Sequence, residues 1–284
     1  MKNEFWLVTT DHLTDRIWFK DDEDFKTGMN IVATLSTMAD LFIISFILMS
    51  NHVHFILGCN RHLADRFITR FKKMYSQYYS KKYGTSALLH RNGVDIRPLH
   101  IGDESFEKGL AYVLMNSVAA NICLHPSAYP WGTGNCFFRN GPGHASRIGD
   151  MSGRERIKLL HSKIPVPEDY AVDERGFVDP VSYVPVKFVE SVFRTPKRLN
   201  WFIQTSSKAK RITEVPSFND QLISAAVRDL SVSLFRKPRI DNLDDSQKAE
   251  LLRQIRYRFS ADPAQIARVC EVPYEKVCSL LESI

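Results

Sequence analysis

The chain has 284 residues, of which 44% are hydrophobic and 25% are charged, and its formal net charge is +6. These values are typical of a globular protein with one large or two modest domains, and they exclude a low-complexity chain. No apolar run approaches the roughly 18 residues of a membrane helix, and the first residues lack a signal-peptide pattern. Five scattered cysteines without a CxxC pair argue against a disulfide framework and against a zinc site built from cysteines alone. We therefore expect a cytoplasmic protein that has no membrane segment.

Charge is distributed unevenly along the chain. Residues 1–60 contain eight acidic and four basic side chains, whereas residues 61–97 contain two acidic and nine basic ones. A basic concentration of this kind predicts a bound polyanion, and a solvated helix face is the alternative explanation.

The first sixty residues alternate between strand and helix patterns. Phe5–Thr10 is apolar and rich in β-forming residues, and residues 24–41 then have the spacing of an amphipathic helix. Phe42–Leu48 and His52–Leu57 follow as two apolar strands. The three residues between them predict an antiparallel hairpin in the middle of a sheet.

A long basic helix is predicted next, with the sequence "LADRFITRFKKMYSQYYSKKYG" from Leu63 to Gly84. One face has three- and four-residue spacing and predicts a buried stripe of Phe67, Phe71, Met74 and Tyr78. A parallel stripe on this helix is basic and consists of Arg66, Arg70 and Lys73. The glycine at the end is a suitable C-terminal stop.

The rest of the chain is predicted in less detail. Residues 90–98 are rich in turn residues and predict a loop, and a second strong helix is predicted over Asp103–Asn121. Residues 141–190 are rich in proline and predict a connector with a short helix near residues 154–161. From Ser191 onward the pattern is all helical, with 16 basic and 11 acidic residues.

The segment "ILMSNHVHFIL" contains two histidines in an apolar strand, and alternation places His52 and His54 on one face. The intervening residues are apolar and can enter a core. Two imidazoles at this spacing can direct their nitrogens at one divalent ion. Two alternatives stay open: a pair of polar residues that faces solvent, and a zinc site that adds Cys59 or His62.

The helix predicted over Asp103–Asn121 offers a further ligand and a nucleophile. Tyr112 and Asn116 are four residues apart and therefore share one helical face. If this helix packs across the histidine face, Asn116 can add an amide oxygen to the metal and Tyr112 can reach a phosphate. A neutral tyrosine is a poor nucleophile and needs a cation beside it. A core tyrosine at helical spacing is the alternative for Tyr112.

These segments together resemble the single-tyrosine HUH transposases, and specifically their branch of REP-associated tyrosine transposases. "MSNHVHFIL" matches the family's histidine-hydrophobic-histidine motif, and "YVLMNSVAANICLHPSAYPWGTG" at residues 112–134 resembles its tyrosine helix and the YPWSS-type segment that follows. The sequence departs from the family pattern at Leu114-Met115, Ser117 and Gly132-Thr133, and none of these changes removes a proposed chemical group. The resemblance covers residues 1–140.

The resemblance implies an α+β fold, in which an antiparallel sheet with flanking helices, of the ferredoxin or RRM type, forms the HUH palm. It implies that His52, His54 and Asn116 bind a divalent metal, Mg²⁺ or Mn²⁺, and that Tyr112 is the nucleophile. The implied reaction is nicking and strand transfer of single-stranded DNA through a 5′-phosphotyrosine, without a nucleotide cofactor. Hairpin or repeat DNA is the implied substrate form, the nucleoid is the implied location, and a homodimer or a monomer stays open.

The basic helix then offers candidate DNA contacts. The phosphate backbone can be followed by Arg66, Arg70, Lys73, Lys81 and Lys82. Tyr79 can stack on a base. Tyr75, Tyr79 and Tyr83 are also rival nucleophiles, which we rank below Tyr112 because none has a metal-binding residue four positions on.

The last helices predict a second DNA-binding element. Start signals at Asp262-Pro263 and Val272-Pro273 divide residues 262–282 into two short helices with the length of a helix-turn-helix. Tyr274 and Lys276 would contact duplex DNA from its recognition helix, and a protein-contact bundle is the alternative.

The sequence thus predicts three parts: an HUH single-tyrosine transposase or nuclease domain over residues 1–140, a connector over residues 141–190, and a mostly helical domain over residues 191–284. The leading hypothesis is a transposase that acts on single-stranded DNA. The alternative is a catalytically silent DNA-binding regulator that keeps the fold.

Overall fold

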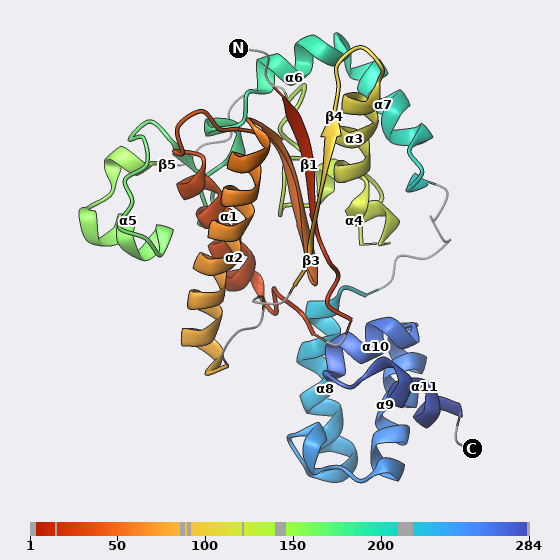
Figure 1. Cartoon of the computed structure of the whole chain (residues 1–284). Coiled ribbons are helices and arrows are strands. Elements are labelled where there is room, and N and C mark those ends of the chain that lie inside the picture. The colour runs from red at the N-terminus through yellow and green to blue at the C-terminus, as the bar shows by residue number, and fades with distance from the viewer. Residues whose placement is uncertain are drawn as a thin grey trace. The chain divides into compact units, whose positions relative to one another are not determined.

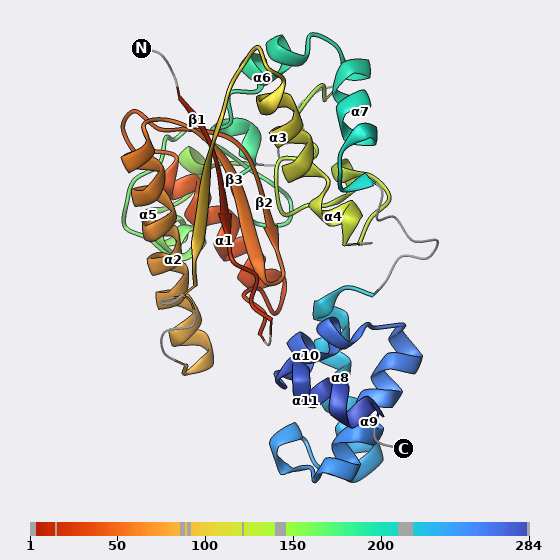
Figure 2. The same cartoon turned by 45° about the vertical axis from the view of Figure 1, so that its right-hand side comes forward.

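The computed structural model describes residues 4–14, 16–85, 89, 92–120, 122–139, 146–209 and 218–282, and Figures 1 and 2 show it from two sides. The contacts divide the chain into two compact units. The sheet unit comprises the described residues of Met1–Asp11, Asp22–Met49 and Val53–Ile212. The helical unit comprises the described residues of His12–Asp21, Ser50–His52 and Thr213–Ile284. Two short segments from the first sixty residues therefore belong to the helical unit.

A four-stranded antiparallel sheet is the centre of the sheet unit (Figure 1). Its strands are β1 (Phe5–Thr10), β2 (Phe42–Met49), β3 (His52–Gly58) and β4 (Val94–Leu99), in the order β2-β3-β1-β4. Strand β1 is antiparallel to β3, and Thr9 of β1 lies opposite His54 of β3. The first three strands confirm the sequence prediction, because their apolar alternation matches a sheet that is covered on its faces.

Strand β4 corrects the sequence prediction of a loop over residues 90–98. Val94–Leu99 pairs with β1 along its whole length. Pro98 has no N–H group to donate to a neighbouring strand, and this is tolerated here because β4 is at the edge of the sheet. Residues 90 and 91 of the predicted loop lie outside the described residues.

Helices cover both faces of the sheet (Figure 2), with α1 (Asp22–Leu35) and α2 (Arg61–Tyr83) on one face and α3 (Ser105–Leu114) on the other. The ring of Phe55 packs against α2, with its centroid 4.9 Å from that of Phe67 and 5.3 Å from that of Phe71. His54, the preceding residue of β3, instead contacts Tyr112 of α3, with ring centroids 5.4 Å apart. The alternation of β3 therefore directs Phe55 toward α2 and His54 toward α3.

Helix α2 confirms the predicted long helix, but its buried stripe differs from the prediction. Phe67 and Phe71 are buried as expected, whereas the stripe continues through Tyr75 and Tyr79. Met74 and Tyr78, which were predicted to continue the stripe, are only half-buried. The prediction used a three-residue step from Phe71 to Met74, whereas the buried residues of α2 continue in steps of four.

The second predicted helix is broken into α3 and α4 (Asn116–Ala119), which are separated at Met115. The side-chain amide of Asn116 donates to the backbone carbonyls of Tyr112, at 2.8 Å, and Val113, at 3.2 Å. In a continuous helix these carbonyls accept backbone N–H groups, so the side chain competes with the helix at this point. Residue 121 of the predicted helix lies outside the described residues.

The segment that follows α4 covers the outer edge of β2. The N–H of Leu48 donates to the carbonyl of Trp131 at 2.9 Å, and the N–H of Thr133 donates to the carbonyl of Phe46 at 3.0 Å. A Cβ atom on Gly132 would lie only 2.6 Å from the Phe46 carbonyl oxygen. A glycine is therefore needed where this segment meets the strand.

The remaining elements of the sheet unit are short. They are η1 (Pro126–Ala128), β5 (Ser146–Arg147), η2 (Ile148–Asp150), α5 (Gly153–Leu160), β6 (Ala171–Val172), η3 (Pro180–Ser182), α6 (Val186–Phe193) and α7 (Pro196–Thr205). Helix α5 confirms the short helix predicted near residues 154–161, and an apolar cluster that includes Ile148 and Leu160 packs on Ala33 of α1. Residues 141–145 of the predicted connector lie outside the described residues.

The helical unit contains α8 (Asp220–Phe235), η5 (Ile240–Asn242), α9 (Asp245–Phe259), α10 (Pro263–Cys270) and α11 (Tyr274–Glu282), as the all-helical pattern of the C-terminal region predicts. Helix α10 begins where expected, because Asp262 caps it by accepting the N–H of Gln265 at 2.7 Å. None of the helices in the described part of the chain has the length and apolar character that a membrane crossing requires.

The segments His12–Asp21 and Ser50–His52 are built into this helical unit. Ile17 is 1% exposed and belongs to the same apolar core as residues of all four helices. The hydroxyl of Ser50 donates to the carboxylate of Asp220 at 2.5 Å. The core of the helical unit therefore holds the loop after β1 and the turn before β3.

Candidate functional site

The two histidines of β3 are buried, His54 against Tyr112 of α3 and His52 against His12. His52 is 5% exposed and His54 is 0% exposed. The alternative of two polar residues that face solvent is therefore excluded. Buried imidazoles need hydrogen-bond partners, and both have an oxygen beside Nδ1.

The hydrogen bonds around Asn51 determine which nitrogen of His52 carries the proton. The Asn51 side-chain amide donates to the carbonyl of Leu13 at 2.8 Å, so its oxygen is directed at Nδ1 of His52, 2.8 Å away. An amide oxygen only accepts, and Nδ1 of His52 must therefore donate. The lone pair is then on Nε2. A metal ion can bind this nitrogen of the neutral imidazole.

His54 connects the histidine pair to the predicted nucleophile. Its Nδ1 is 2.9 Å from the hydroxyl of Thr9, and its ring meets that of Tyr112 edge to face, at 5.4 Å between centroids. The structure therefore brings Tyr112 and the histidine face together, as the sequence analysis expected for a helix that packs across this face.

His12 is a third histidine at this place, and the sequence analysis did not single it out. Its ring is stacked on that of His52, with the centroids 3.6 Å apart. One ring nitrogen from each of His12, His52 and His54 lies within 4.8 Å of the other two. Among the described residues, this is the only group of three or more histidine, cysteine or acidic side chains with metal-binding spacing. The cluster could therefore bind a divalent metal ion.

The pairing of β1 with β3 is the one feature from which the position of His12 could have been predicted. Antiparallel pairing puts Thr9 opposite His54, so the residues that follow β1 run alongside those that precede His54. His12 follows the end of β1 by two positions. Finding it needs the register between two strands that are more than forty residues apart in the sequence.

The alternative zinc site receives no support from this cluster. Neither Cys59 nor His62 belongs to the group of neighbouring ligands. Burial raises the pKa of the Cys59 thiol to about 12, as expected for a cysteine packed among apolar side chains.

Asn116 and Lys208 complete the surroundings of Tyr112. Asn116 is 3% exposed, and its amide nitrogen is bonded to the carbonyl of Tyr112 itself. Its amide oxygen is the atom that can serve as a metal ligand. The ammonium of Lys208 lies 4.7 Å from the centroid of the half-buried Tyr112 ring. Tyr112 therefore has a cation on its ring, which is the partner that a nucleophilic tyrosine needs.

Helix α7, which leads to Lys208, is attached to α3 by a partly buried ion pair. Arg198 of α7 donates to the carboxylate of Glu107 on α3 at 3.1 Å, and Glu107 is 5% exposed. A cavity of about 320 Å³ is lined by residues of α3 and of α7 and its C-terminal end: Lys108, Trp201, Phe202, Thr205, Ser206 and Ser207. The ion pair connects the helix of Tyr112 with the helix that precedes Lys208.

The rival tyrosines lie on α2, across the sheet from Tyr112. Tyr75 is 0% exposed, and burial raises its pKa well above the usual value. Tyr79 is 3% exposed, so its ring does not present a face on which a base can stack. Tyr83 donates to the buried carboxylate of Asp24 at 2.8 Å. Of these tyrosines and Tyr112, only Tyr112 contacts a histidine of the cluster in the described structure.

The predicted basic contacts also lie on α2 and hence are not brought to the tyrosine face. Of these predicted contacts, Arg66, Arg70, Lys73 and Lys81 have exposed side chains and form no ion pair with another described residue. Lys82 differs from them, because it forms an ion pair with the buried Asp24 at 2.8 Å. In the helical unit, Lys276 is paired with Asp245, whereas the ring of Tyr274 is 49% exposed.

A scan against protein-family models finds no match for this chain, and neither does a search of curated proteins. Among solved structures, the chain is similar to the structure of a REP-associated tyrosine transposase bound to a REP hairpin. The two chains are 13% identical, the match covers 61% of this chain and 88% of the other, and the TM-score is 0.37. A likeness this distant carries no information on the chemistry of the site.

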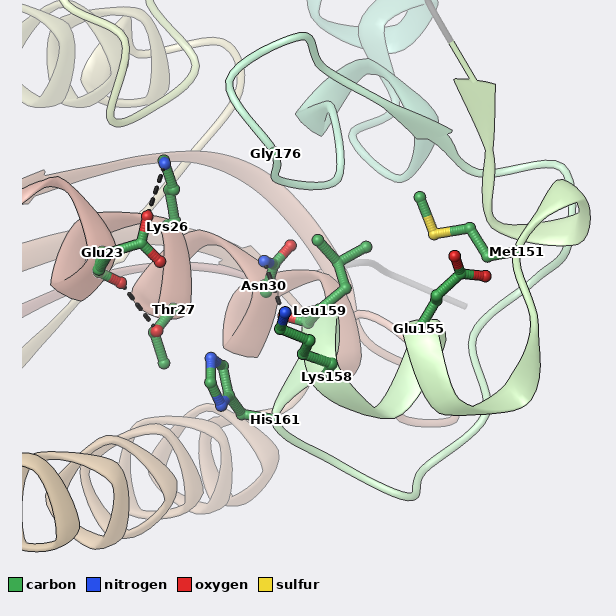
Figure 3. A pocket seen from close by; sticks show the side chains of 10 residues that line it. All are labelled: Glu23, Lys26, Thr27, Asn30, Met151, Glu155, Lys158, Leu159, His161 and Gly176. Atoms are coloured by element: carbon green, nitrogen blue, oxygen red, sulfur yellow. Dashed lines mark hydrogen bonds and ion pairs between the residues drawn. The ribbon is translucent and has the colours of Figure 1, made fainter.

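A separate cavity of about 300 Å³ lies between α1 and α5 in the sheet unit (Figure 3). Its polar groups are largely engaged with one another: Lys26 pairs with Glu23 at 2.7 Å. Asn30 donates to the carbonyl of Leu159 at 3.0 Å and accepts the N–H of Val178 at 2.9 Å. These contacts connect α1 with α5, so the cavity has a structural explanation and is a weaker candidate than the histidine cluster.

Proposed function

We propose that this chain is a metal-dependent single-stranded DNA endonuclease and strand transferase that uses Tyr112 as its nucleophile. The observation that carries the proposal is the contact of Tyr112 with His54, which itself belongs to a cluster of three histidines. A tyrosine beside a potential metal site, with a lysine on its ring, has the groups that attack on a phosphodiester requires.

The donor set suits a divalent first-row ion. His12, His52 and His54 would supply imidazole nitrogens, and Asn116 would add an amide oxygen. Imidazole-rich sites are less suited to Mg²⁺, which prefers oxygen ligands, so of the two predicted ions Mn²⁺ fits better. When bound there, the ion would polarise a phosphate oxygen and stabilise the negative charge that develops during attack.

The chain's own residues would carry out the transfer. The phenolic oxygen of Tyr112 forms a bond to phosphorus, and the bond from phosphorus to the 3′-oxygen breaks in line with it. The products are a 5′-phosphotyrosine and a free 3′-hydroxyl, and attack by a second 3′-hydroxyl reverses the step and joins two strands. Lys208 would stabilise the phenolate while the tyrosine proton leaves to solvent. The phosphodiester energy is retained in the covalent link.

The DNA contacts that we propose outside this site come from the sequence prediction. Arg66, Arg70, Lys73 and Lys81 are proposed to contact the backbone of DNA that extends beyond the tyrosine face. A hairpin substrate, contact of duplex DNA by the helical unit through Lys276, and a homodimer remain predictions.

The test is formation of a covalent adduct between purified protein and a pool of random single-stranded oligonucleotides that carry a 3′-terminal label. Because the 5′-phosphate side remains on the protein, the label migrates with the protein on a denaturing gel. We expect an adduct with Mn²⁺, none with EDTA, and none from Tyr112→Phe. Zn²⁺ and Mg²⁺ are run in parallel to compare the ions.

Tyr257→Phe is the matched control, since Tyr257 is 87% exposed on α9 and should form the adduct like the wild type. An adduct that persists in Tyr112→Phe would overturn the assignment of the nucleophile. Clear DNA binding without any adduct from a pool that contains genomic hairpins would favour the catalytically silent regulator instead.

A further inference from the structure

The helical unit contains a groove that shares a residue with the histidine cluster. It has a volume of about 490 Å³, which is within the usual range of ligand sites, and it is lined by His12, Leu13, Thr14, Asn51, Ala264, Arg268, Pro273, Tyr274 and Glu275. His12 is stacked on His52, and Asn51 is hydrogen-bonded to His52. One wall of the groove is therefore formed by His12 and Asn51, the two residues that contact His52.

The opposite wall comes from α10 and α11, which pack against one another (Figure 2). Tyr274 is the first residue of α11, and its ring is 49% exposed. Much of the ring surface is therefore accessible at the start of a helix, which is what a stacking platform needs.

The charges of the groove favour a base over a phosphate. Arg268 is its one arginine, and the guanidinium is paired with Asp220 at 3.2 Å. Glu275 adds an exposed carboxylate to the lining. A phosphate would therefore find no uncompensated cation among the lining residues, whereas a nucleobase brings an uncharged ring with polar edges.

We infer that this groove, formed within the helical unit, is a subsite for a nucleobase of single-stranded DNA, which stacks on Tyr274 across from His12 and Asn51. The base belongs to the single-stranded DNA that is the proposed substrate, so the inference rests on the proposed function for the substrate it names. The helical unit would then bind single-stranded DNA itself, rather than only contacting duplex DNA.

The test measures binding without chemistry. Full-length Tyr112→Phe protein in EDTA is titrated into a fluorescein-labelled random single-stranded 20-mer, and fluorescence anisotropy gives the affinity. When Tyr274→Ala is added to this Tyr112→Phe protein, the affinity should fall about tenfold, as expected for the loss of one base stack. With Tyr274→Phe instead, the affinity should change by less than about twofold. Tyr257→Ala removes another exposed tyrosine of the helical unit and should have no effect.

A second variant and a second signal separate stacking from damage to the fold. Ala264→Leu narrows the groove from the side of α10 and should weaken binding while Tyr274 is still present. Single-stranded oligonucleotides with 2-aminopurine at successive positions should show quenching on binding at one position, and Tyr274→Ala should remove that quenching.

Either of two results would overturn the inference. One is equal binding by Tyr274→Ala and Tyr257→Ala. The other is a loss that is seen with a duplex of the same length and not with the single strand, which would support the predicted helix-turn-helix. Because these measurements need neither metal nor adduct, failure of the proposed reaction would be recognised separately, in the adduct gel.

Discussion

The two faces of β3 are both buried, yet they contain opposite kinds of side chain. Phe55, on one face, contacts Phe67 and Phe71 of α2, and all of these rings are 0% exposed. His54, on the other face, is also 0% exposed, but its neighbours are the hydroxyl of Thr9 and the ring of Tyr112. Apolar burial stabilises the fold directly, whereas buried imidazoles cost free energy unless they are hydrogen-bonded. The comparison teaches that the first face stabilises the fold by apolar burial, whereas the second face keeps buried polar groups that the fold does not need for its stability.

The largest expected effect is on the apolar face. Phe71→Ala should lower the free energy of unfolding by about 3–5 kcal/mol, because it removes a fully buried ring and leaves a cavity. Urea unfolding of the metal-free protein measures the change. Phe42→Ala, at a residue that is 50% exposed, is the control and should cost less than about 1 kcal/mol. Equal losses in the two variants would remove the contrast between a buried aromatic face and the surface.

His54→Ala should have its main effect on metal binding. With Mn²⁺ at about 100 times its dissociation constant, the wild type should gain about 2.7 kcal/mol of stability, seen as a rise in Tm. The variant should show almost no rise, because one of three nitrogen ligands is missing. Each protein is compared with itself in EDTA, so a change in basal stability does not affect the result. The exposed His62→Ala should retain the full rise, and a rise in His54→Ala would contradict the metal site.

Asn51→Ala should weaken Mn²⁺ binding about 10- to 100-fold, the usual effect of removing the partner that orients a histidine ligand. The reason is that Nδ1 of His52 loses the oxygen that makes Nε2 the lone-pair nitrogen. Isothermal titration calorimetry measures the affinity. Asn51→Asp keeps an accepting oxygen and should recover most of the binding, whereas equal weakening in both variants would assign Asn51 a purely structural role.

The smallest expected effect concerns Lys208, whose ammonium lies over the Tyr112 ring. Lys208→Ala should slow adduct formation about tenfold and leave Mn²⁺ affinity unchanged, because the lysine stabilises charge on the tyrosine and is not a ligand. Single-turnover kinetics give the rate. Lys208→Arg should restore most of it, and the exposed Lys197→Ala should match the wild type. A loss of Mn²⁺ affinity in Lys208→Ala would instead indicate disturbance of the cluster.

Local sequence patterns were sufficient to predict the strand and the helix that carry the candidate site residues. The alternation of His52–Leu57 predicts a strand whose histidines share a face, and the structure has this strand and this division of faces. The four-residue spacing of Tyr112 and Asn116 likewise predicts neighbours, although the helix is broken between them because the Asn116 side chain bonds to the Tyr112 carbonyl. Backbone geometry alone sets these periods, so a short window of sequence contains the information.

The sequence by itself therefore determined the strands β1 to β3, the long helix α2, the histidine pair and the tyrosine helix. Only the tertiary structure decided that His12 joins the pair, that Lys208 lies on Tyr112, and that the basic helix α2 covers the opposite face. It also decided that the loop containing His12 is held by the core of the helical unit. These relations depend on strand register and on packing between segments far apart in the chain, and no local periodicity specifies them.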